Sequence, residues 1–453
     1  MGTYLIQDPH HEYASRFIRL IRERYGHRPI AFFTRGAKER FYRRHECLPE
    51  GEFAAVYEVD SGDLGAFAAR VRERHPELQA IVPYSEETLE YTAALQERLS
   101  LRWNAAETLA RFCHKSALKD HLRRVVPSLR LNFSCRVASA AEVFALGDSL
   151  PRTFILKPDS GFGSRGVAVF TREMRAEVEQ FFARAPDAYV LEEFLHGKLY
   201  AVDGLVDAQG NVLVASIFSS GRRHLNGCPV VYANGALIHR DTPLFDELGA
   251  YAREVLRAGG LQRSPFHMEV VRDARGPCLI EVGARLVGHS HAFTCERVHG
   301  GAFDFFGLAA AGYFGKPMDV RLSFEHYDRV QAVKVYGASE VAGTAYEVRG
   351  IEEVEALASF DRWIVKPRPG VELRRTVDLF SVPYSLVLVG PRGGEPLGEV
   401  GERVHEMIRF GTGGSILDRA RVGGEALADK MRRKLGWMAE QARRSLMHAT
   451  GQR

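Results

Sequence analysis

The chain has 453 residues, of which 45% are hydrophobic and 26% are charged. This composition excludes a disordered chain, and the length is enough for about three domains that each bury a core. The formal net charge of +4 is small for this length, so the sequence does not indicate a dedicated nucleic-acid binder.

No apolar run approaches the roughly 20 residues that a membrane-spanning helix needs, and the first residues lack the basic-then-apolar pattern of a signal peptide. The six cysteines form no CxxC pair and no metal-finger spacing, which is typical of reduced thiols in a core. We therefore expect a soluble, cytoplasmic protein with neither a membrane nor a nucleic acid as partner.

The first hundred residues alternate short apolar runs with amphipathic stretches. Strands are expected at 4–6, 30–33, 54–59 and 80–82, and helices at 13–25, 64–74 and 86–99. This alternation predicts a small parallel sheet with crossover helices, and we assign it to a first domain at 1–104.

The next two hundred residues hold many short strand-like segments with dense glycine and charge. The clearest are 154–156, 167–170, 188–191, 202–206, 212–217, 267–271 and 278–282. They predict an α+β central domain at 105–318. A third domain, 319–453, is expected to hold strands at 331–336 and 385–389 and a basic amphipathic helix near 425–448.

A glycine-rich loop follows Lys157, between two apolar, strand-like runs, and contains Gly161, Gly163 and Gly166. Glycines let backbone N–H groups wrap phosphate oxygens, and a nearby lysine can place a positive charge on the same oxygens. The spacing matches GxGxxG, but a dinucleotide site needs a helix after the glycines, whereas 167–170 is β-like. The loop therefore predicts phosphate binding, and a hairpin without a ligand is the alternative.

A protein-kinase loop has the same strand–loop–strand context, and His239, Arg240 and Asp241 spell the HRD motif. However, Asp246 stands where that motif requires asparagine, no DFG follows, and Lys157 precedes the loop instead of following it. These departures exclude the kinase interpretation.

Two glutamates are expected to face each other on a β-hairpin formed by 266–271 and 279–285. Strand alternation places His267, Glu269 and Val271 on one face, and Leu279, Glu281, Gly283 and Arg285 on one face of the partner strand. With the turn centred at Arg275, Glu269 lies directly opposite Glu281.

Such opposed carboxylates are destabilising unless a cation lies between them, which indicates a Mg²⁺ or Mn²⁺ site. Arg285 shares the face and suits a transferring phosphoryl group or a bound carboxylate. A register slip, with two solvated glutamates, is the alternative, and His267 alone fits a packed histidine.

Taken in chain order, these motifs resemble those of the ATP-grasp carboxylate–amine ligases. The long C-terminal region and the Glu-Val-Gly-Ala-Arg run at 281–285 are most similar to L-amino-acid (dipeptide) ligases. The resemblance implies a pre-ATP-grasp parallel-sheet domain, a central two-lobed ATP-grasp domain with its flap at 157–170 and metal hairpin at 266–285, and a C-terminal α+β domain.

The resemblance also implies ATP and Mg²⁺ (or Mn²⁺) as cofactors and assigns the following roles. Lys115, Lys157, Gly163, Ser164 and Gly166 would hold the phosphates; Glu192 would accept from the adenine amino group, with the backbone of Glu193 and Leu195 on the ring; Glu269 and Glu281 would bind metal, and Arg285 would be catalytic. Leu199 departs from the family's ribose-binding glutamate, and Gly283 departs from its metal-ligating asparagine.

The activity so implied is an ADP-forming carbon–nitrogen ligase that converts a carboxylate, such as that of an amino acid, into an acyl phosphate and couples it to an amine. Small-molecule carboxylates and amines would be its substrates, and homodimers are common in the family.

His267 is a candidate for meeting the amino substrate, and Arg222, within 219–229, for a loop lining the acceptor site; a solvated basic loop is the alternative. A carboxylase-like or purine-pathway-like ligase and a non-catalytic nucleotide-binding regulatory subunit remain as alternative functions.

Overall fold

The computed structural model describes residues 2–9, 12–34, 50–60, 63–101, 103–160, 166–184, 188–288, 291–318, 322 and 324–413. Gly163, Ser164 and the helix expected near 425–448 lie outside the described residues.

The N-terminal part of the chain forms the expected parallel sheet. Its strands are β1 (Thr3–Gln7), β2 (Arg28–Thr34), β3 (Ala55–Val59) and β4 (Leu78–Ile81), in the order β3-β2-β1-β4. All neighbouring strands pair in parallel, and the helices are α1 (Glu12–Tyr25), α3 (Leu64–Arg74) and α4 (Glu86–Arg98). The prediction from alternating apolar runs is confirmed.

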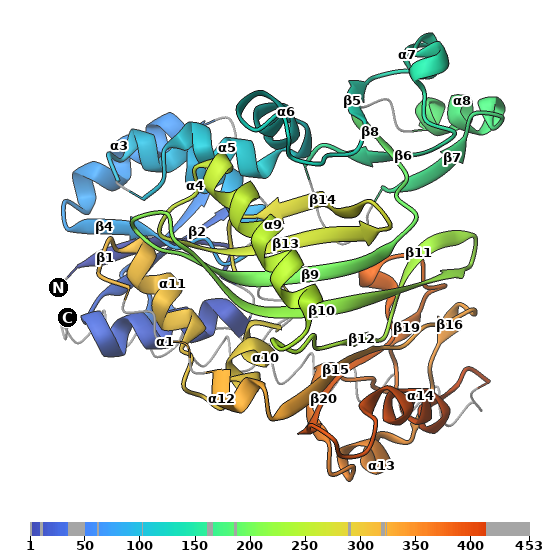
Figure 1. The fold of residues 1–453 in the computed structure, drawn as a ribbon. Helices are drawn as coiled ribbons and strands as arrows, with labels where there is room; N and C mark the ends of the chain where they lie inside the picture. Colours follow the sequence, from blue (N-terminus) through green and yellow to red (C-terminus); the bar gives the residue numbers. More distant parts are fainter. Residues whose placement is uncertain are drawn as a thin grey trace.

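Two antiparallel sheets follow. The smaller has the order β5-β8-β6-β7, from β5 (Ser134–Val137), β6 (Thr153–Pro158), β7 (Ala168–Thr171) and β8 (Tyr189–Glu193). With α7 (Ala140–Ala145) and α8 (Arg175–Arg184) it forms a small lobe with its own core, at the upper right of Figure 1.

The larger sheet has the order β11-β10-β9-β13-β14. Its strands are β9 (Lys198–Val206), β10 (Val212–Leu225), β11 (Cys228–Ala233), β13 (Ser264–Asp273) and β14 (Gly276–Gly283). One face packs on α9 (Pro243–Gly259), α5 (Ala106–Cys113) and α6 (Lys115–Val125), and α9 runs across it in Figure 1. The prediction of a loop at 219–229 is wrong, because β10 and β11 pair as a hairpin through most of it and place Arg222 on a strand.

The third part of the chain is an α+β unit. Its main sheet has the order β12-β15-β20-β18, from β12 (Gly235–Ala236), β15 (Val330–Tyr336), β18 (Phe360–Val365) and β20 (Ser385–Pro391). Helices α13 (Ile351–Glu355) and α14 (Leu397–Met407) pack on it, and two small pairs join β16 (Gly343–Thr344) to β19 (Glu372–Leu373) and β17 (Glu347–Arg349) to β21 (Arg409–Gly411). Because β12 comes from the central part, the third sheet is not built from the last part of the chain alone.

The first and central parts share a core. Helices α10 (His291–Val298) and α11 (Phe305–Tyr313) precede the short α12 (Phe324–Tyr327), and α11 packs on α1. The Phe306 ring, fully buried, lies edge-on to Tyr13 and Phe17 at 5.0 and 5.2 Å between centroids. The predicted boundaries at 104/105 and 318/319 stay predictions, and the buried core continues across the first of them.

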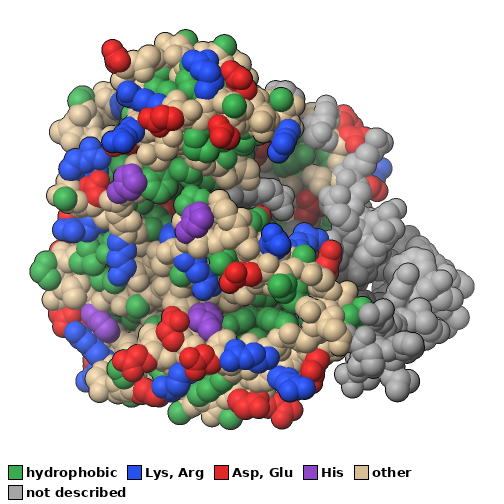
Figure 2. All heavy atoms as spheres, turned by 90° about the vertical axis from the view of Figure 1, so that its right-hand side faces the viewer, with side chains coloured by type: hydrophobic (Ala, Val, Ile, Leu, Met, Phe, Trp, Pro, Cys, Tyr) green, Lys and Arg blue, Asp and Glu red, His purple; other side chains and the backbone are tan. Residues whose placement is uncertain are grey.

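No helix in the described ranges is both long and apolar enough to cross a membrane. On the described part of the face drawn in Figure 2, basic and acidic side chains are interspersed, so no broad patch of one charge covers it.

We predict that Phe306→Ala lowers the free energy of unfolding by about 3–5 kcal/mol, because it empties the core that joins α1 to α11. Urea denaturation followed by circular dichroism measures this. Phe380→Ala is the matched control, because Phe380 is 42% exposed, and it should change stability by less than about 1 kcal/mol. Equal effects of the two changes would contradict the shared core.

Candidate active site

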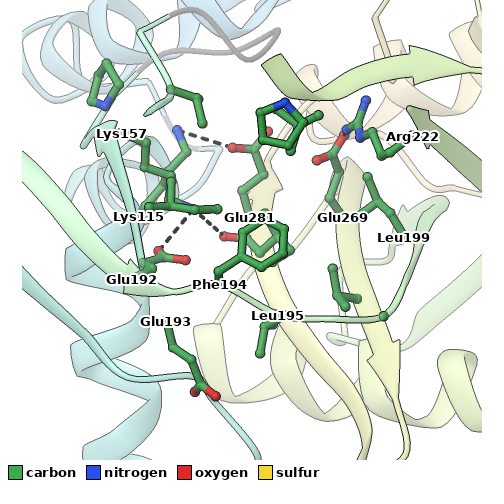
Figure 3. Close-up of a pocket in the computed structure, with 18 of the residues that line it drawn as sticks. Lys115, Lys157, Glu192, Glu193, Phe194, Leu195, Leu199, Arg222, Glu269 and Glu281 are labelled. Atoms are coloured by element: carbon green, nitrogen blue, oxygen red, sulfur yellow. Dashed lines mark hydrogen bonds and ion pairs between the residues drawn. The ribbon is translucent and has the colours of Figure 1, made fainter. Parts of the chain in front are cut away.

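A cavity lies between the smaller and the larger sheet. Its charged lining comes from both sheets and from the start of α6: Lys115, Lys157, Glu192, Arg222, Glu269 and Glu281. The rest is mostly apolar and includes Ile155, Phe194, Leu195, Leu199, Val271 and Ile280. Figure 3 shows Lys115 and Lys157 extending toward Glu281 and Glu192, with Leu195 and Leu199 elsewhere on the wall. One cavity therefore joins an apolar surface to a cluster of charges.

The two glutamates of the hairpin lie opposite each other, as predicted, but by a different route. The turn pairs Asp273 with Gly276, and this register alone would place Glu269 opposite Ile280. A β-bulge between the Glu269 and Val270 pairs adds Ile280 to β14 and brings Glu281 opposite Glu269.

Because of this bulge, one residue that strand alternation predicts on the same face as Glu281 lies on the other face of the sheet. Leu279 was expected beside Glu281, but it is fully buried in the core against α9, and Ile280 lines the cavity with Glu281 instead. The reason is that the extra residue interrupts strict strand alternation.

Lys115 is placed by the capping of α6, which begins at this residue. Asp159, just after β6, accepts hydrogen bonds from the Ser116 backbone N–H (2.8 Å) and hydroxyl (2.7 Å), and its carbonyl accepts from the Lys115 N–H (3.1 Å). A carboxylate at a helix N-terminus satisfies N–H groups that have no partner within the helix. This contact ties the start of the glycine segment to the helix that carries Lys115.

Lys115 and Glu281 form an ion pair of 3.3 Å between Nζ and Oε2. Burial acts to lower the pKa of Lys115, but Glu281, Glu86 and Glu192 together outweigh it and the pKa is raised. Burial acts to raise the pKa of Glu281, but Lys115 and Lys157 outweigh it and the pKa is lowered. Both groups are therefore charged at neutral pH.

Glu192 is a buried counter-charge for two lysines. Its Oε1 lies 3.0 Å from Lys157 Nζ and its Oε2 lies 2.8 Å from Lys119 Nζ, while Asn132 Nδ2 donates to Oε2 at 3.1 Å. Burial acts to raise the pKa of Glu192, but the lysines outweigh it and lower the pKa to about 2. With both oxygens so engaged, an adenine contact of this carboxylate stays a prediction.

At the end of β8, Glu193 and Leu195 differ in whether their backbone N–H and C=O groups already have hydrogen-bond partners in the described part of the protein. The Glu193 N–H donates to Phe133, its carbonyl accepts from Asn132, and its side chain pairs with Arg275 at 3.1 Å, pointing away from the cavity in Figure 3. Leu195 lines the cavity, and among the described residues its backbone groups have no partner in the protein. Leu195 is therefore freer than Glu193 for the predicted ring contact, and Leu199 presents an apolar side chain on the same wall.

Arg222 reaches the carboxylates from the β10–β11 hairpin. Its guanidinium lies over the Tyr232 ring at 3.6 Å from the centroid, and its Nη2 is 3.9 Å from Glu269 Oε1. Figure 3 shows Arg222 directed at Glu269. The two facing glutamates are thus each approached by a cation, Lys115 on one side and Arg222 on the other.

A second cavity adjoins the first. Tyr232, Glu269 and Glu281 line both cavities. The remaining wall of the second cavity combines apolar residues such as Phe218, Val287 and Leu379 with the polar residues Ser219, Ser220, His267, Arg285, His291, Lys334 and Tyr336. The structure thus brings the predicted residues Glu269, Glu281, Arg285 and His267 together around one space. Gly166, with φ of +71°, lies beside Pro158 and outside both cavity linings.

Arg285 is held by a residue from the N-terminal part of the chain. Its Nε lies 2.6 Å from Glu86 Oε2, at the start of α4, and its Nη1 donates to the Leu286 carbonyl at 3.0 Å. A Cβ at Gly283 would lie 2.5 Å from the same Glu86 oxygen. The glycine at 283 therefore leaves space for the ion pair that orients Arg285.

His267 is oriented by a buried carboxylate. Its Nδ1 lies 2.7 Å from Oδ1 of Asp203, which is fully buried on β9, and the imidazole lines the second cavity. His267 is therefore a fixed hydrogen-bonding group at this wall and not only a packed histidine.

Sequence reasoning missed Glu86, Asp203, Asn132 and Lys119. Lys119 had a signal, because it follows Lys115 by four residues and so lies on the same face of α6. The other three come from distant segments, and their sequence contexts carry no motif.

Glu269 and Glu281 alone do not supply a full set of protein ligands for a metal ion. The described residues contain no group of three or more His, Cys, Asp or Glu side chains that could hold an ion. Mg²⁺ takes one or two carboxylates and completes its shell with water and substrate phosphates, so Glu269 and Glu281, which line one cavity with Lys115 and Lys157, fit this ion.

Comparison with known sequences agrees with this geometry. The profile of a family described as "ATP-grasp domain" matches residues 150–292, from β6 to α10. Dapdiamide A synthase from Enterobacter agglomerans is 31% identical over 155 residues, which are 32% of this chain and 36% of that protein. The alignment thus spans about a third of that relative's length.

Solved structures match over almost the whole chain. An L-amino acid ligase from Bacillus licheniformis has a TM-score of 0.72 at 17% identity, covering 91% of this chain and 99% of that one. A phosphoribosylglycinamide synthetase from Anaerococcus prevotii has a TM-score of 0.62 at 12% identity, covering 91% and 100%. The chain has the ATP-grasp fold. This fold agrees with the prediction from the motifs.

We predict that Glu192→Gln lowers the free energy of unfolding by about 3–5 kcal/mol, because it leaves two buried lysines without their counter-charge. The depressed pKa means that this stabilisation is complete above the ordinary carboxyl pKa of 4.5 and is lost as the pH falls toward about 2. The difference between wild type and variant should therefore narrow over that window.

Urea denaturation at a series of pH values tests this. Glu193→Gln is the matched control, because the Glu193–Arg275 pair is exposed and worth about 0–1 kcal/mol. A loss below about 1 kcal/mol in Glu192→Gln would contradict a buried counter-charge.

Proposed function

We propose that the chain is an ADP-forming carbon–nitrogen ligase that activates the carboxylate of an amino acid as an acyl phosphate and joins it to an amine. The main support is that two cavities share Glu269 and Glu281 as a common wall. One cavity suits a nucleotide and the other suits polar substrates, so a phosphoryl group could pass between them at the shared carboxylates.

The nucleotide would occupy the first cavity. Its apolar wall suits a base, and Leu195 offers free backbone groups for polar contacts with the ring. Lys115 and Lys157 would hold the phosphates, with the glycine segment that follows Lys157 as flap. Glu269 and Glu281 would hold Mg²⁺ or Mn²⁺, which when bound supplies positive charge to the transferring phosphoryl group.

In the first step an oxygen of the substrate carboxylate attacks the γ-phosphorus, and the bond from that phosphorus to the ADP oxygen breaks. Both reactants are anions: two unit charges 4 Å apart repel by about 1 kcal/mol in water and about 4 kcal/mol at an effective dielectric of 20. Lys115, Lys157 and Arg285 are the chain's own groups that offset this repulsion, and Glu86 fixes the direction of Arg285.

In the second step the neutral amine attacks the carbonyl carbon of the acyl phosphate. The C–N bond forms, the C–O bond to phosphate breaks, and an amine proton leaves with phosphate or to solvent. His267, held by Asp203, lines the cavity where the amine would lie. Water must be kept from the acyl phosphate until the amine attacks.

The names of the relatives support amino acids as the substrate class. The sequence relative is a dapdiamide synthase and one structural match is an L-amino acid ligase. A cytoplasmic location, which the composition favours, and a homodimer, which is common among ATP-grasp ligases, are part of the proposal.

A second candidate is a non-catalytic subunit that binds nucleotide. It is favoured by Leu199, which puts an apolar side chain in the first cavity, and by Gly283, which removes one oxygen ligand. It predicts ATP binding without turnover.

The test is ADP release with ATP and Mg²⁺ across pairs of the twenty amino acids, with mass spectrometry of the products. We expect release that requires both substrates and a product of their summed mass less water. Glu281→Gln should lower kcat at least about 100-fold, the size typical of losing one preorganised electrostatic group, whereas Glu193→Gln should stay within twofold. ATP binding without ADP release on any pair would favour the non-catalytic subunit.

We also predict that Gly283→Ala lowers kcat/KM for the carboxylate substrate by about 10- to 100-fold, because its Cβ pushes Glu86 and so turns Arg285 away. The KM for ATP should stay within twofold. Gly398→Ala, on α14 where a Cβ meets nothing within 4 Å, is the control. Unchanged kinetics in Gly283→Ala would show that the Glu86–Arg285 pair does not position the substrate.

A further inference from the structure

Lys334 is a buried cation at the wall of the second cavity, which Glu269 and Glu281 also line. It lies on β15, is 5% exposed, and its Nζ sits 4.0 Å from the centroid of the Phe218 ring. Within the described part of the chain no carboxylate lies within ion-pair distance of this ammonium. The nearby Asp203 directs Oδ1 at His267 instead.

The other cations of the two cavities differ in this respect. Lys115 pairs with Glu281 at 3.3 Å and Arg285 with Glu86 at 2.6 Å, and Arg222 approaches Glu269 at 3.9 Å. Lys334 thus adds a positive charge to the second cavity that no described carboxylate neutralises by contact.

Keeping this ammonium buried is unfavourable for the fold. Moving a charged group out of water without a partner is costly, and burial lowers the pKa of Lys334, although Asp203 and Cys295 act in the opposite direction. The aromatic face of Phe218 offsets part of the cost. A methionine would fill similar space without a charge, and the buried Asp203, whose Oδ2 has no hydrogen-bond partner among the described residues, forms no ion pair with Lys334.

The geometry separates Lys334 from the reacting centre. Phe218, under the ammonium, pairs with Ala201, which pairs with Glu269, and Glu269 pairs with Glu281. Phe218 and Glu269 are therefore two strand spacings apart, about 10 Å across the sheet. Lys334 and the glutamates therefore line different parts of the wall of the second cavity, with Lys334 over Phe218 and the glutamates two strands further along the sheet.

We propose that Lys334 binds a second substrate carboxylate, one that is not activated and stays free in the product. The second cavity is then selective for a substrate pair that carries such a group. Either of two substrate groups can supply this carboxylate: the α-carboxylate of the acceptor, if the acceptor is an amino acid, or the side-chain carboxylate of a dicarboxylic donor. This inference rests on the proposed ligase function and deepens it.

The test compares acids with their neutral amides in wild type and Lys334→Met. For each productive pair, the acceptor is replaced by its α-carboxamide in one arm, and an acidic donor (aspartate or glutamate) by asparagine or glutamine in the other. In wild type, replacing the recognised carboxylate by its amide should raise the KM for that substrate by about 10- to 100-fold, as expected for losing a charged hydrogen bond.

In Lys334→Met the acid and the amide should bind within about threefold of each other, with the KM for ATP unchanged. Lys316→Met, an exposed lysine outside both cavities, should keep the wild-type preference. The arm in which the preference disappears identifies the source of the carboxylate. An equal preference for the acid in wild type and Lys334→Met, in both arms, would overturn the proposal.

Two further readouts separate the possible failures. A structural role for Lys334 predicts a lower Tm in Lys334→Met, whereas a charge kept for a ligand predicts an equal or higher Tm. If no pair releases ADP, the ligase function fails, and calorimetric titration of the amino acids and their amides in the presence of Mg²⁺ and a non-hydrolysable ATP analogue carries the test. Binding of the acids that Lys334→Met abolishes supports the carboxylate site; no binding, or binding that the variant retains, contradicts it.

Discussion

Two carboxylates held face to face on neighbouring strands are the constraint around which the rest of the site is arranged. Glu269 and Glu281 repel each other, and three other elements bring positive charge to them. Helix α6 contributes Lys115, the β10–β11 hairpin contributes Arg222, and the smaller sheet contributes Lys157. Lys157 in turn needs Glu192, which is buried with a second lysine. The charges form one connected set that spans both sheets.

The sequence predicted the parts of the site that local chemistry encodes. Alternating apolar runs predict the parallel sheet, because strands and crossover helices have different periods. The lysine before a glycine segment and the glutamates flanking a turn are short-range patterns, and the resemblance to the ATP-grasp ligases gave their order a meaning. The structure brings Lys115, Lys157, Glu269, Glu281 and Arg285 to the same pair of cavities.

What could not be predicted depends on contacts between distant segments or on the geometry of a strand pair. Glu86 lies almost 200 residues before Arg285, and nothing around it indicates an ion pair. Lys334 reads as an ordinary strand residue until β15 is seen against Phe218. Similarly, alternation assigned Leu279 to the wrong face, because a bulge leaves no clear mark in sequence and shifts the alternation by one residue.

The bulge at Ile280 also limits how this hairpin can vary. Hairpin turns at a protein surface usually tolerate insertions and deletions, since only the loop has to adapt. Here the two-residue turn and the extra residue act together to set the register, so losing or gaining one residue in either would rotate one glutamate into the apolar core against α9. Natural length variation should therefore fall in other surface loops of this protein, and the segment between the two glutamates should keep a fixed length of eleven residues.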